Sequence, residues 1–261
     1  MKYTFCTLFW IPLLYAQNTC NDNVCIANTN IRGSWSVGDN IPYDIRMQTR
    51  VACHGFEAYG IEVGEDVYMD MDVFKTRHLI LDLGESWCSP CQEHQEGEFG
   101  QVHNKYLNDT RIAFIIGLGS LGSPYSCKSW ANLAKNIGTS SLIVEDDAQP
   151  QWGNLFGNGF YPRLLFISQK RVIYLEENNP YSNSSEFEHA IDKFLETWTE
   201  YQLGDVNLDS TINVLDIVVL IQLVLGKQET SSGLQYFTSD YNSDSILNIL
   251  DIVGIVNLIL S

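Results

Sequence analysis

The chain has 261 residues, a formal net charge of −17 at pH 7 and seven cysteines. This length suffices for one α/β domain and a second, smaller unit, so we expect two domains. No basic stripe interrupts the acidic excess, which excludes a nucleic-acid-binding surface because phosphate recognition needs clustered Lys and Arg side chains.

The N-terminus has the pattern of a targeting segment. Residues 1–16, MKYTFCTLFWIPLLYA, contain one lysine, an uncharged apolar run and a small residue at the end. This pattern predicts a secretory signal peptide cleaved near Ala16, with a retained membrane anchor as the alternative. No later segment reaches the roughly 18 uncharged apolar residues of a transmembrane helix. We therefore expect a secreted protein, periplasmic, extracellular or associated with the cell surface, and no transmembrane segment in the mature chain.

Secretion would place the six remaining cysteines in an oxidising compartment, where disulfides persist. Residues 17–49 are rich in Asn, show little periodicity and are expected to form an extended lead-in. Besides the pair at 88 and 91, four cysteines allow three pairings, so the connectivity stays open. The local choice is Cys20 with Cys25, which leaves Cys53 with Cys127. Structural disulfides are the default, and a second redox relay is the alternative.

Residues 50–202 follow an α/β pattern. The apolar run HLILDL from His78 predicts a buried strand, and apolar residues recur at helical spacing over 88–107, although Gly97 and Gly100 weaken that helix. Further strands are expected at 111–119, 141–146, 163–168 and 172–177, and helices near 129–137, 152–157 and 187–198. This order, βαβα and then ββα, predicts a mixed sheet covered by helices.

Two cysteines three positions apart, Cys88 and Cys91, follow the predicted strand directly in the motif WCSPC. If Cys88 begins a helix, its sulfur lies at the positive end of the helix dipole beside unpaired N–H groups, and both effects favour the thiolate. We expect Cys88 to attack and Cys91 to resolve. Pro90 suits the first helical turn because it has no N–H to lose. A zinc site would need a second close ligand pair, and a purely structural CxxC bridge would stabilise little.

An acid interrupts the apolar run six residues before Cys88. A buried carboxylate is costly unless it is paired or used, so we expect Asp82 to be a base that takes the proton of Cys91 during resolution. The alternatives are a residue turned to solvent or a hydrogen-bonded polar group. His94 is expected on the helix surface, with tuning of the thiols as the alternative.

With these residues, the region from about 50 to 200 resembles the secreted, redoxin-type thioredoxin-like thiol–disulfide oxidoreductases. WCSPC matches the WCxPC centre of that family, and Asp82 stands where the family has a buried aspartate. Tyr161-Pro162, before the strand at 163–168, is similar to the family's cis-proline segment. The resemblance implies a thioredoxin-like fold, protein thiols and disulfides as partners, and no organic cofactor. It also implies catalytic roles for Cys88, Cys91 and Asp82 and substrate binding by Trp87, Tyr161 and Pro162.

Two other functions fit the same region. A thiol peroxidase would have Thr or Ser three residues before a lone attacking cysteine, where this chain has Glu85. A non-catalytic thioredoxin-fold protein that binds partners while displayed on a scaffold is the second alternative. The direction of electron flow, the natural substrate and the electron donor are not encoded in the motif.

After Gln202 two similar segments follow, GDVNLDSTINVLDIVVLIQLVLG and SDYNSDSILNILDIVGIVNLIL, which predict a duplicated small unit. Each begins with a twelve-residue loop that has oxygen donors at positions 1, 3, 5, 9 and 12 and a backbone carbonyl at position 7, the spacing with which short loops hold Ca²⁺. Three carboxylates per loop repel one another, so calcium binding and folding are expected to be coupled. The expected ligands of the two ions are Asp205, Asn207, Asp209, Thr211, Asn213 and Asp216, and Asp240, Asn242, Asp244, Ile246, Asn248 and Asp251.

An apolar helix follows each loop, and the two helices are expected to bury their apolar faces on each other. These faces are Val214, Ile217, Val218, Ile221 and Val224, and Ile249, Ile252, Val253 and Val256. Residues 203–261 resemble a type I dockerin module, which implies a small all-α calcium-binding domain that docks onto a cohesin-like scaffold protein. Ser210 and Ser245 stand where such loops have Gly. The partner-reading positions, 214–215 and 249–250, are unusually apolar, which indicates a partner that differs from a standard cohesin.

Overall fold

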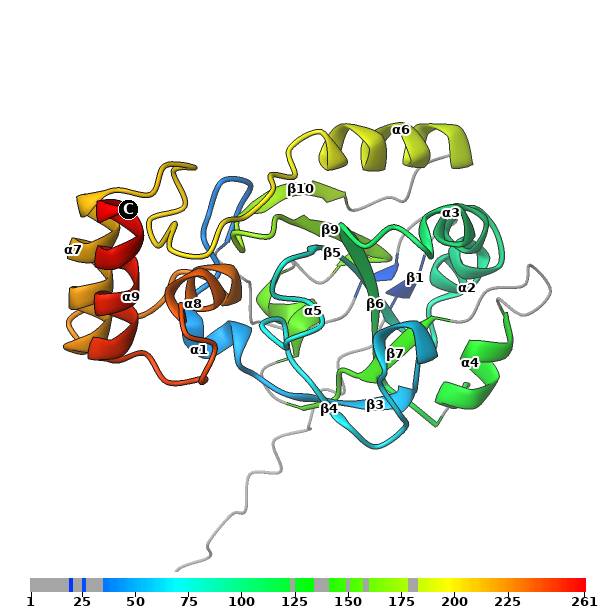
Figure 1. The fold of residues 1–261 in the computed structure, drawn as a ribbon. Helices are drawn as coiled ribbons and strands as arrows, with labels where there is room; N and C mark the ends of the chain where they lie inside the picture. The colour runs from blue at the N-terminus through cyan, green and yellow to red at the C-terminus, as the bar shows by residue number, and fades with distance from the viewer. Residues whose placement is uncertain are drawn as a thin grey trace, which may run out of the picture.

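The computed structural model of the chain describes residues 19–20, 25–26, 35–122, 125–133, 141–148, 151–156, 160–177 and 183–261. A larger part built on a β-sheet lies beside a smaller helical part that contains the C-terminus (Figure 1). The predicted signal peptide, residues 1–16, lies outside the described residues. Within the described ranges, no helix combines the length and apolar character needed to cross a membrane.

A seven-stranded mixed sheet forms the centre of the larger part, in the order β10-β9-β5-β6-β7-β3-β4. β5 pairs in parallel with β6 and antiparallel with β9, so the strand that leads to the cysteine pair is held on both sides. The predicted mixed sheet is confirmed. The strands are β3 (Arg50–His54), β4 (Asp66–Val67), β5 (His78–Glu85), β6 (Ile112–Gly119), β7 (Leu142–Glu145), β9 (Arg163–Ile167) and β10 (Ile173–Glu177).

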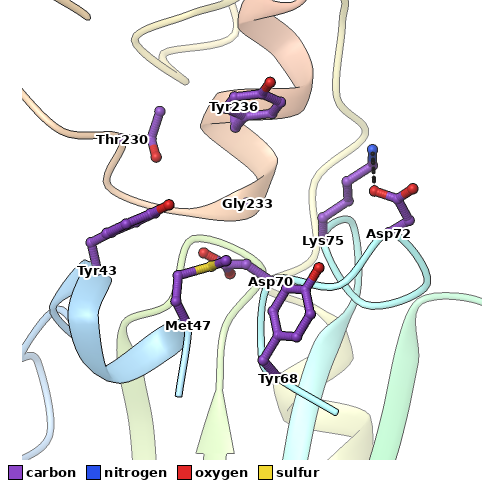
Figure 2. A pocket seen from close by; sticks show the side chains of 9 residues that line it. All are labelled: Tyr43, Met47, Tyr68, Asp70, Asp72, Lys75, Thr230, Gly233 and Tyr236. Carbon is purple, nitrogen blue, oxygen red and sulfur yellow. Dashed lines mark hydrogen bonds and ion pairs between the residues drawn. The ribbon is translucent and has the colours of Figure 1, made fainter. Parts of the chain in front are cut away.

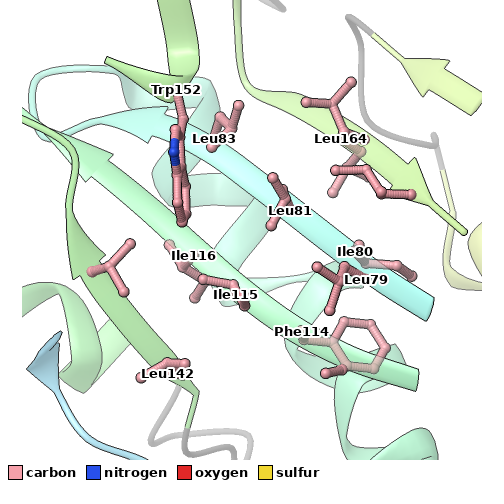
Figure 3. Packing of buried hydrophobic residues seen from close by; sticks show 14 of the residues in the cluster. Leu79, Ile80, Leu81, Leu83, Phe114, Ile115, Ile116, Leu142, Trp152 and Leu164 are labelled. Atoms are coloured by element: carbon pink, nitrogen blue, oxygen red, sulfur yellow. The ribbon is translucent and has the colours of Figure 1, made fainter. Parts of the chain in front are cut away.

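The inner strands are buried on both faces, as their nearly continuous apolar sequences require. Every residue of β5, β6 and β9 is buried. Leu81 of β5 and Ile115 of β6 are partners in the parallel ladder, and Figure 3 shows their side chains beside each other. The polar side chains within these strands are therefore held in the core.

Helices cover the sheet, but the segment after Cys88 forms two helices instead of one. Gly97 has φ −109° and ψ −113°, outside the helical region, and separates α2 from α3. The predicted apolar face of α6 is buried, including Phe187, Ile191 and Phe194. The helices are α1 (Tyr43–Arg46), α2 (Ser89–Glu96), α3 (Glu98–Tyr106), α4 (Cys127–Leu133), α5 (Trp152–Leu155) and α6 (Ser184–Leu195).

Part of the predicted lead-in packs on the sheet. Ile41 and Ile45 belong to the same buried cluster as the central strands, and Asn40 forms an isolated bridge with Val172. The domain boundary at residue 50 stays a prediction.

A second, small sheet has the order β1-β2-β8 and is antiparallel throughout. Its strands are β1 (Thr19–Cys20), β2 (Cys25–Ile26) and β8 (Phe160–Tyr161). It joins the N-terminal segment to the chain just before β9, a long-range pairing that the hydrophobic pattern did not indicate.

The helical part contains α7 (Val214–Val224), α8 (Gly233–Ser239) and α9 (Ile249–Leu260), which confirms the predicted small all-α unit. α7 and α9 pack side by side (Figure 1) around Val206, Leu220, Leu223 and Ile255. The predicted burial of the whole apolar faces is wrong. α7 and α9 are apolar on nearly all sides, but they contact each other along only one stripe, so the other apolar side chains stay exposed. The exposed members of the predicted faces are Val214, Val218, Ile221, Ile249 and Val253.

The two parts are in direct contact. The Lys75 ammonium lies over the ring of Phe237 in α8, 4.4 Å from its centroid, and Lys170 donates to the carbonyl of Leu208 at 2.7 Å. The Arg46 guanidinium donates to the carbonyl of Thr230. A cavity of about 280 Å³ lies at this junction (Figure 2), lined by Tyr43, Met47, Tyr68, Asp70, Asp72, Lys75, Thr230, Gly233 and Tyr236.

A buried arginine ties this junction to the sheet. Arg171, 0% exposed, donates to the Asp70 carboxylate at 2.8 Å and to the carbonyls of Met69 at 2.6 Å and Phe74 at 2.9 Å. Asp70 also pairs with the buried Arg46. Replacing one member of such a network leaves charges and carbonyls buried without partners.

We therefore expect Arg171→Met to lower the free energy of unfolding by about 3–5 kcal/mol. The matched control is Arg111→Met, because Arg111 pairs with Asp109 on the surface and such pairs contribute no more than about 1 kcal/mol. Urea denaturation followed by tryptophan fluorescence measures both. Equal losses in the two variants would contradict a structural role of the Arg171 network.

Candidate active site and candidate calcium loops

The two cysteines of the WCSPC motif form a disulfide at the start of α2. Their Cα atoms are 5.3 Å apart. Cys88 is the N-cap residue, and its Sγ accepts a hydrogen bond from the backbone N–H of Cys91 at 3.2 Å. Pro90 stands in the first turn, as predicted. The sulfur of Cys88 therefore occupies the position at which free N–H groups and the helix dipole stabilise a thiolate.

The disulfide is buried in this oxidised form. Cys88 is 0% and Cys91 is 2% exposed, while Trp87 beside them is half-buried and Ser89 is exposed. The predicted attacking sulfur is therefore not open to an incoming protein as the chain stands. Access to it requires movement of the surrounding chain.

Asp82 lies on the face of β5 that Cys91 packs against. Asp82 and Gly84 are two positions apart and share a strand face. A Cβ atom on Gly84 would lie 3.5 Å from the Cys91 sulfur, which identifies that face. Gln95, one helical turn after Cys91, donates to the Asp82 carboxylate. Burial raises the pKa of Asp82 from 3.8 to about 7, so this carboxyl group can hold or release a proton near neutral pH.

The prediction of a surface position for His94 is wrong. His94 is 3% exposed, and its ring contacts Phe99 in α3 and Phe187 in α6, because these helices cover α2. Its Nε2 lies 3.8 Å from the carboxylate of Asp82. Burial lowers the pKa of His94 to about 3, so the neutral ring supplies no charge that would keep Asp82 ionised.

A second buried acid lies on the opposite face of β5. Glu85 is three positions from Asp82, and its backbone carbonyl accepts the N–H of Cys88 at 2.9 Å. Burial, and after it the nearby Asp146 and Asp147, raise the pKa of Glu85 to about 7. Its Oε2 has no hydrogen-bond partner among the described residues. Sequence reasoning missed this group; the only available signal was an acid at the end of a buried strand.

The segment before β9 meets the end of β5. The Tyr161–Pro162 peptide bond is cis, which confirms the expectation from the resemblance. Leu83 of β5 pairs with Arg163, so Tyr161 lies alongside the end of β5, and β8 contacts that strand. Tyr161 is buried, and its hydroxyl packs so closely over Gly153 that a Cβ atom there would lie 2.2 Å away. This contact explains why position 153 requires glycine.

The other cysteines pair partly as expected. Cys53 and Cys127 form a disulfide that links β3 to α4, with Cα atoms 5.9 Å apart. Cys20 and Cys25 are opposite each other in the backbone ladder of β1 and β2. Their side chains lie outside what the structure describes, so a bond between them stays a prediction.

The two predicted calcium loops have the same conformation. In the first, the Asp205 carboxylate accepts the N–H groups of Asp209 at 3.0 Å and Ser210 at 2.9 Å. In the second, the Asp240 carboxylate accepts those of Asp244 at 3.1 Å and Ser245 at 2.9 Å. The last acid of each loop reaches back to its third residue: Asp216 accepts from Asn207 at 3.0 Å, and Asp251 from Asn242 at 3.2 Å. The hydrogen bonds at corresponding positions of the two loops are therefore the same.

Ser210 and Ser245 occupy the position at which such loops use glycine. Both are in the left-handed region, with φ of 70° and 66°. Serine reaches this region at a cost that glycine avoids, so each loop has the required turn at some expense of stability.

No Lys, Arg or His side chain forms an ion pair with the predicted loop carboxylates within the described ranges. Asp216 and Asp251 are nevertheless 0% exposed. No group of three or more His, Cys, Asp or Glu side chains in the same ranges is placed to hold a metal ion. The predicted ligand sets differ from such groups because they combine carboxylates with Asn amides and a backbone carbonyl, and these donor types suit a hard cation.

Residues 203–260 match the family of the Dockerin type I domain. No protein among the curated ones matches the chain.

Solved structures similar to the chain are remote. A secreted disulfide oxidoreductase from Mycobacterium tuberculosis, described as homologous to E. coli DsbE, has 13% identity and a TM-score of 0.42, and the match covers 58% of this chain and 99% of that chain. The thioredoxin domain of a thiol-disulfide oxidoreductase from Bacteroides vulgatus has 14% identity, a TM-score of 0.43 and coverage of 62% and 99%. A thiol:disulfide interchange protein from Bacteroides sp. has 14% identity, a TM-score of 0.44 and coverage of 63% and 93%. The dockerin family thus accounts for the C-terminal part of this chain, while the redox assignment depends on its own residues.

Proposed function

We propose that this chain is a secreted thiol–disulfide oxidoreductase tethered by its dockerin domain to a cohesin-like scaffold protein. The observation that carries the redox part is the Cys88–Cys91 disulfide at the N-terminus of α2, with the Asp82 carboxyl group buried on the side of Cys91. Its substrates are protein thiols and disulfides in the periplasm, outside the cell or at the cell surface.

The exchange has two steps. In the reduced protein the Cys88 thiolate attacks a substrate disulfide, which forms a mixed disulfide and releases one substrate sulfur as thiolate. Cys91 then attacks the Cys88 sulfur, which closes the internal disulfide and releases the second substrate thiolate. The reverse sequence oxidises a substrate dithiol. Trp87, Tyr161 and Pro162 are the proposed substrate-binding residues.

Asp82 is the proposed proton acceptor for Cys91. A carboxylate whose pKa is about 7 is a far stronger base near neutral pH than an ordinary aspartate, because its proton affinity is higher. Gln95 holds its orientation from the same helix face as Cys91. The neutral His94 adds no charge to this path.

A trapping experiment tests the two cysteine roles. Cys88→Ser is expected to lower the rate of reduction of an added protein disulfide at least about a hundredfold, because the nucleophile is lost. Cys91→Ser is expected to accumulate the mixed disulfide between Cys88 and the substrate, identified by mass spectrometry. Cys53→Ser/Cys127→Ser, which removes the other disulfide, is the control and is expected to retain exchange. An unaffected rate in Cys88→Ser would favour the non-catalytic binding protein.

Asp82→Asn is expected to slow resolution by Cys91 by about 10²–10⁴-fold, because the base is removed. Its effect on stability follows from the raised pKa. The folded wild type binds a proton more strongly than the unfolded chain does, so the wild type loses stability as pH rises from about 4 through about 7. Asp82→Asn has no titratable group at this position, so its stability does not fall in this pH range for this reason. Its stability relative to wild type therefore rises by a few kcal/mol between about pH 4 and pH 8, measured by urea denaturation at each pH.

Glu85→Gln is the matched control for that measurement. Glu85 is also buried with a pKa of about 7, but it lies on the other face of β5. We expect the same pH-dependent gain in stability without slower resolution by Cys91. Equal slowing in both variants would contradict a specific role of Asp82.

The dockerin domain would hold two Ca²⁺ ions, one in each loop. Bound calcium supplies positive charge that offsets the clustered carboxylates, which otherwise have no basic partner among the described residues. Val214 and Ile249, both 62% exposed, and Leu215 and Leu250 offer two equivalent apolar patches next to the loops. These patches are the proposed contact with the cohesin-like partner.

Calorimetric titration of the full chain with calcium is expected to show two sites. Asp209→Ala/Asp216→Ala and Asp244→Ala/Asp251→Ala are each expected to leave one site, because each removes two ligands of one loop. Glu57→Ala, in an exposed turn of the larger part, is the control and is expected to leave two. Binding to an immobilised cohesin-like scaffold is expected to disappear with a chelator. Failure to detect calcium binding would remove the docking proposal.

A further inference from the structure

The N-terminal strand β2 occupies an edge of β8, the short strand that precedes Pro162 and β9. β2 pairs antiparallel with β8, with Cys25 opposite Tyr161 and Ile26 opposite Phe160. β8 thus links β2 to β5: it pairs with β2 and contacts β5, and β5 ends three residues before Cys88. Backbone pairing of an added strand with a free edge is a common way for a protein to hold an extended peptide.

That strand contains one of two facing cysteines. In the ladder between β1 and β2, Cys20 is the direct partner of Cys25. Directly opposed residues of antiparallel strands have Cα atoms about 4.5–5.5 Å apart, within the range of about 4.4–6.8 Å that a disulfide spans. The backbone spacing therefore permits a disulfide between Cys20 and Cys25.

We propose that Cys20 and Cys25 form a second redox pair that exchanges electrons with the Cys88–Cys91 centre, so that the N-terminal strands are its resident substrate. This inference rests on the proposed function, because it requires Cys88 and Cys91 to perform disulfide exchange. The observation that supports this inference independently is the pairing of β2 with β8.

The exchange balances within the chain. The Cys88 thiolate attacks the Cys25 sulfur, forms a Cys88–Cys25 bond and displaces Cys20 as thiolate. Cys91 attacks the Cys88 sulfur, closes the Cys88–Cys91 disulfide and displaces Cys25 as thiolate. Two electrons pass to the N-terminal pair, and the protons lost by the Cys88 and Cys91 thiols match those taken up by Cys20 and Cys25. An external protein disulfide, the substrate class proposed above, then reoxidises the N-terminal dithiol.

Burial of the redox centre favours an internal partner. Cys88 is 0% exposed, so an external protein disulfide must displace neighbouring chain before it reaches the sulfur. The N-terminal strand β2 is already paired with β8, the segment that contacts β5. In this arrangement the second pair acts as a relay between a closed centre and larger substrates.

Trapping in the full chain tests the relay. Cys20→Ser/Cys91→Ser leaves Cys25 and Cys88, and Cys25→Ser/Cys91→Ser leaves Cys20 and Cys88. After equilibration in a glutathione redox buffer, peptide mass spectrometry of the unreduced protein measures the internal disulfide. Because Cys25 is the residue opposite Tyr161, we expect at least about tenfold more Cys25–Cys88 bond than Cys20–Cys88 bond.

A third variant separates ordered pairing from random collision of a tethered segment. Ile26→Pro, added to Cys20→Ser/Cys91→Ser, removes a backbone N–H from the strand without altering any cysteine. Relay through the paired strand predicts a clear loss of the Cys25–Cys88 bond. Equal trapping by Cys20 and Cys25, no trapping, or trapping that Ile26→Pro leaves unchanged would each overturn the proposal.

The two proposals fail in different ways. The proposed function fails if Cys88→Ser leaves reduction of an added protein disulfide unchanged. The relay fails if that reaction depends on Cys88 while the Cys25–Cys88 bond does not form preferentially.

Discussion

The pairing of β5 with neighbours on both sides is the constraint on which the redox chemistry depends. β6 and β9 hold every residue from Leu79 to Leu83, so the end of β5 is at a defined point at the centre of the sheet. Only two residues, Ser86 and Trp87, connect Glu85 to the helix cap at Cys88. The Cys88 sulfur is therefore presented to the first free N–H groups of α2 by a strand that is paired on both sides.

The same strand places two acids in the core, one on each face, and the surroundings of their side chains differ. Asp82 shares a face with Gly84, whose missing side chain leaves room for the Cys91 sulfur, and accepts a hydrogen bond from Gln95. Glu85 lies among other acids, next to Tyr161, and burial together with the nearby Glu85 carboxyl raises the pKa of that tyrosine. Burial raises the pKa of both carboxyl groups to about 7, but only Asp82 shares the face of β5 on which Cys91 packs. Their separation by three positions gives the redox centre an acid on each side of its sheet.

The helical C-terminal part is in direct contact with the part that contains the sheet. α8 contacts the loop around Lys75, and the carbonyl of Leu208, within the first predicted calcium loop, accepts a hydrogen bond from Lys170 at the β9–β10 turn. The apolar patches next to the two loops still face outwards. A scaffold bound there would thus hold the redox domain in a defined orientation.

The amino-acid sequence by itself determined what depends on local chemistry. The WCSPC motif after an apolar run, and the repeated oxygen spacing of the two loops, identified the disulfide, the helix start and the twin loop conformations, because each depends on residues close together in the chain. Tertiary structure alone decided the properties that depend on distant segments. His94 is buried because α3 and α6 cover its helix, and many apolar residues of α7 and α9 stay exposed because the two helices pack on each other along only one stripe. The pairing of Cys25 with Tyr161 joins residues 136 positions apart, and no local periodicity encodes such a contact.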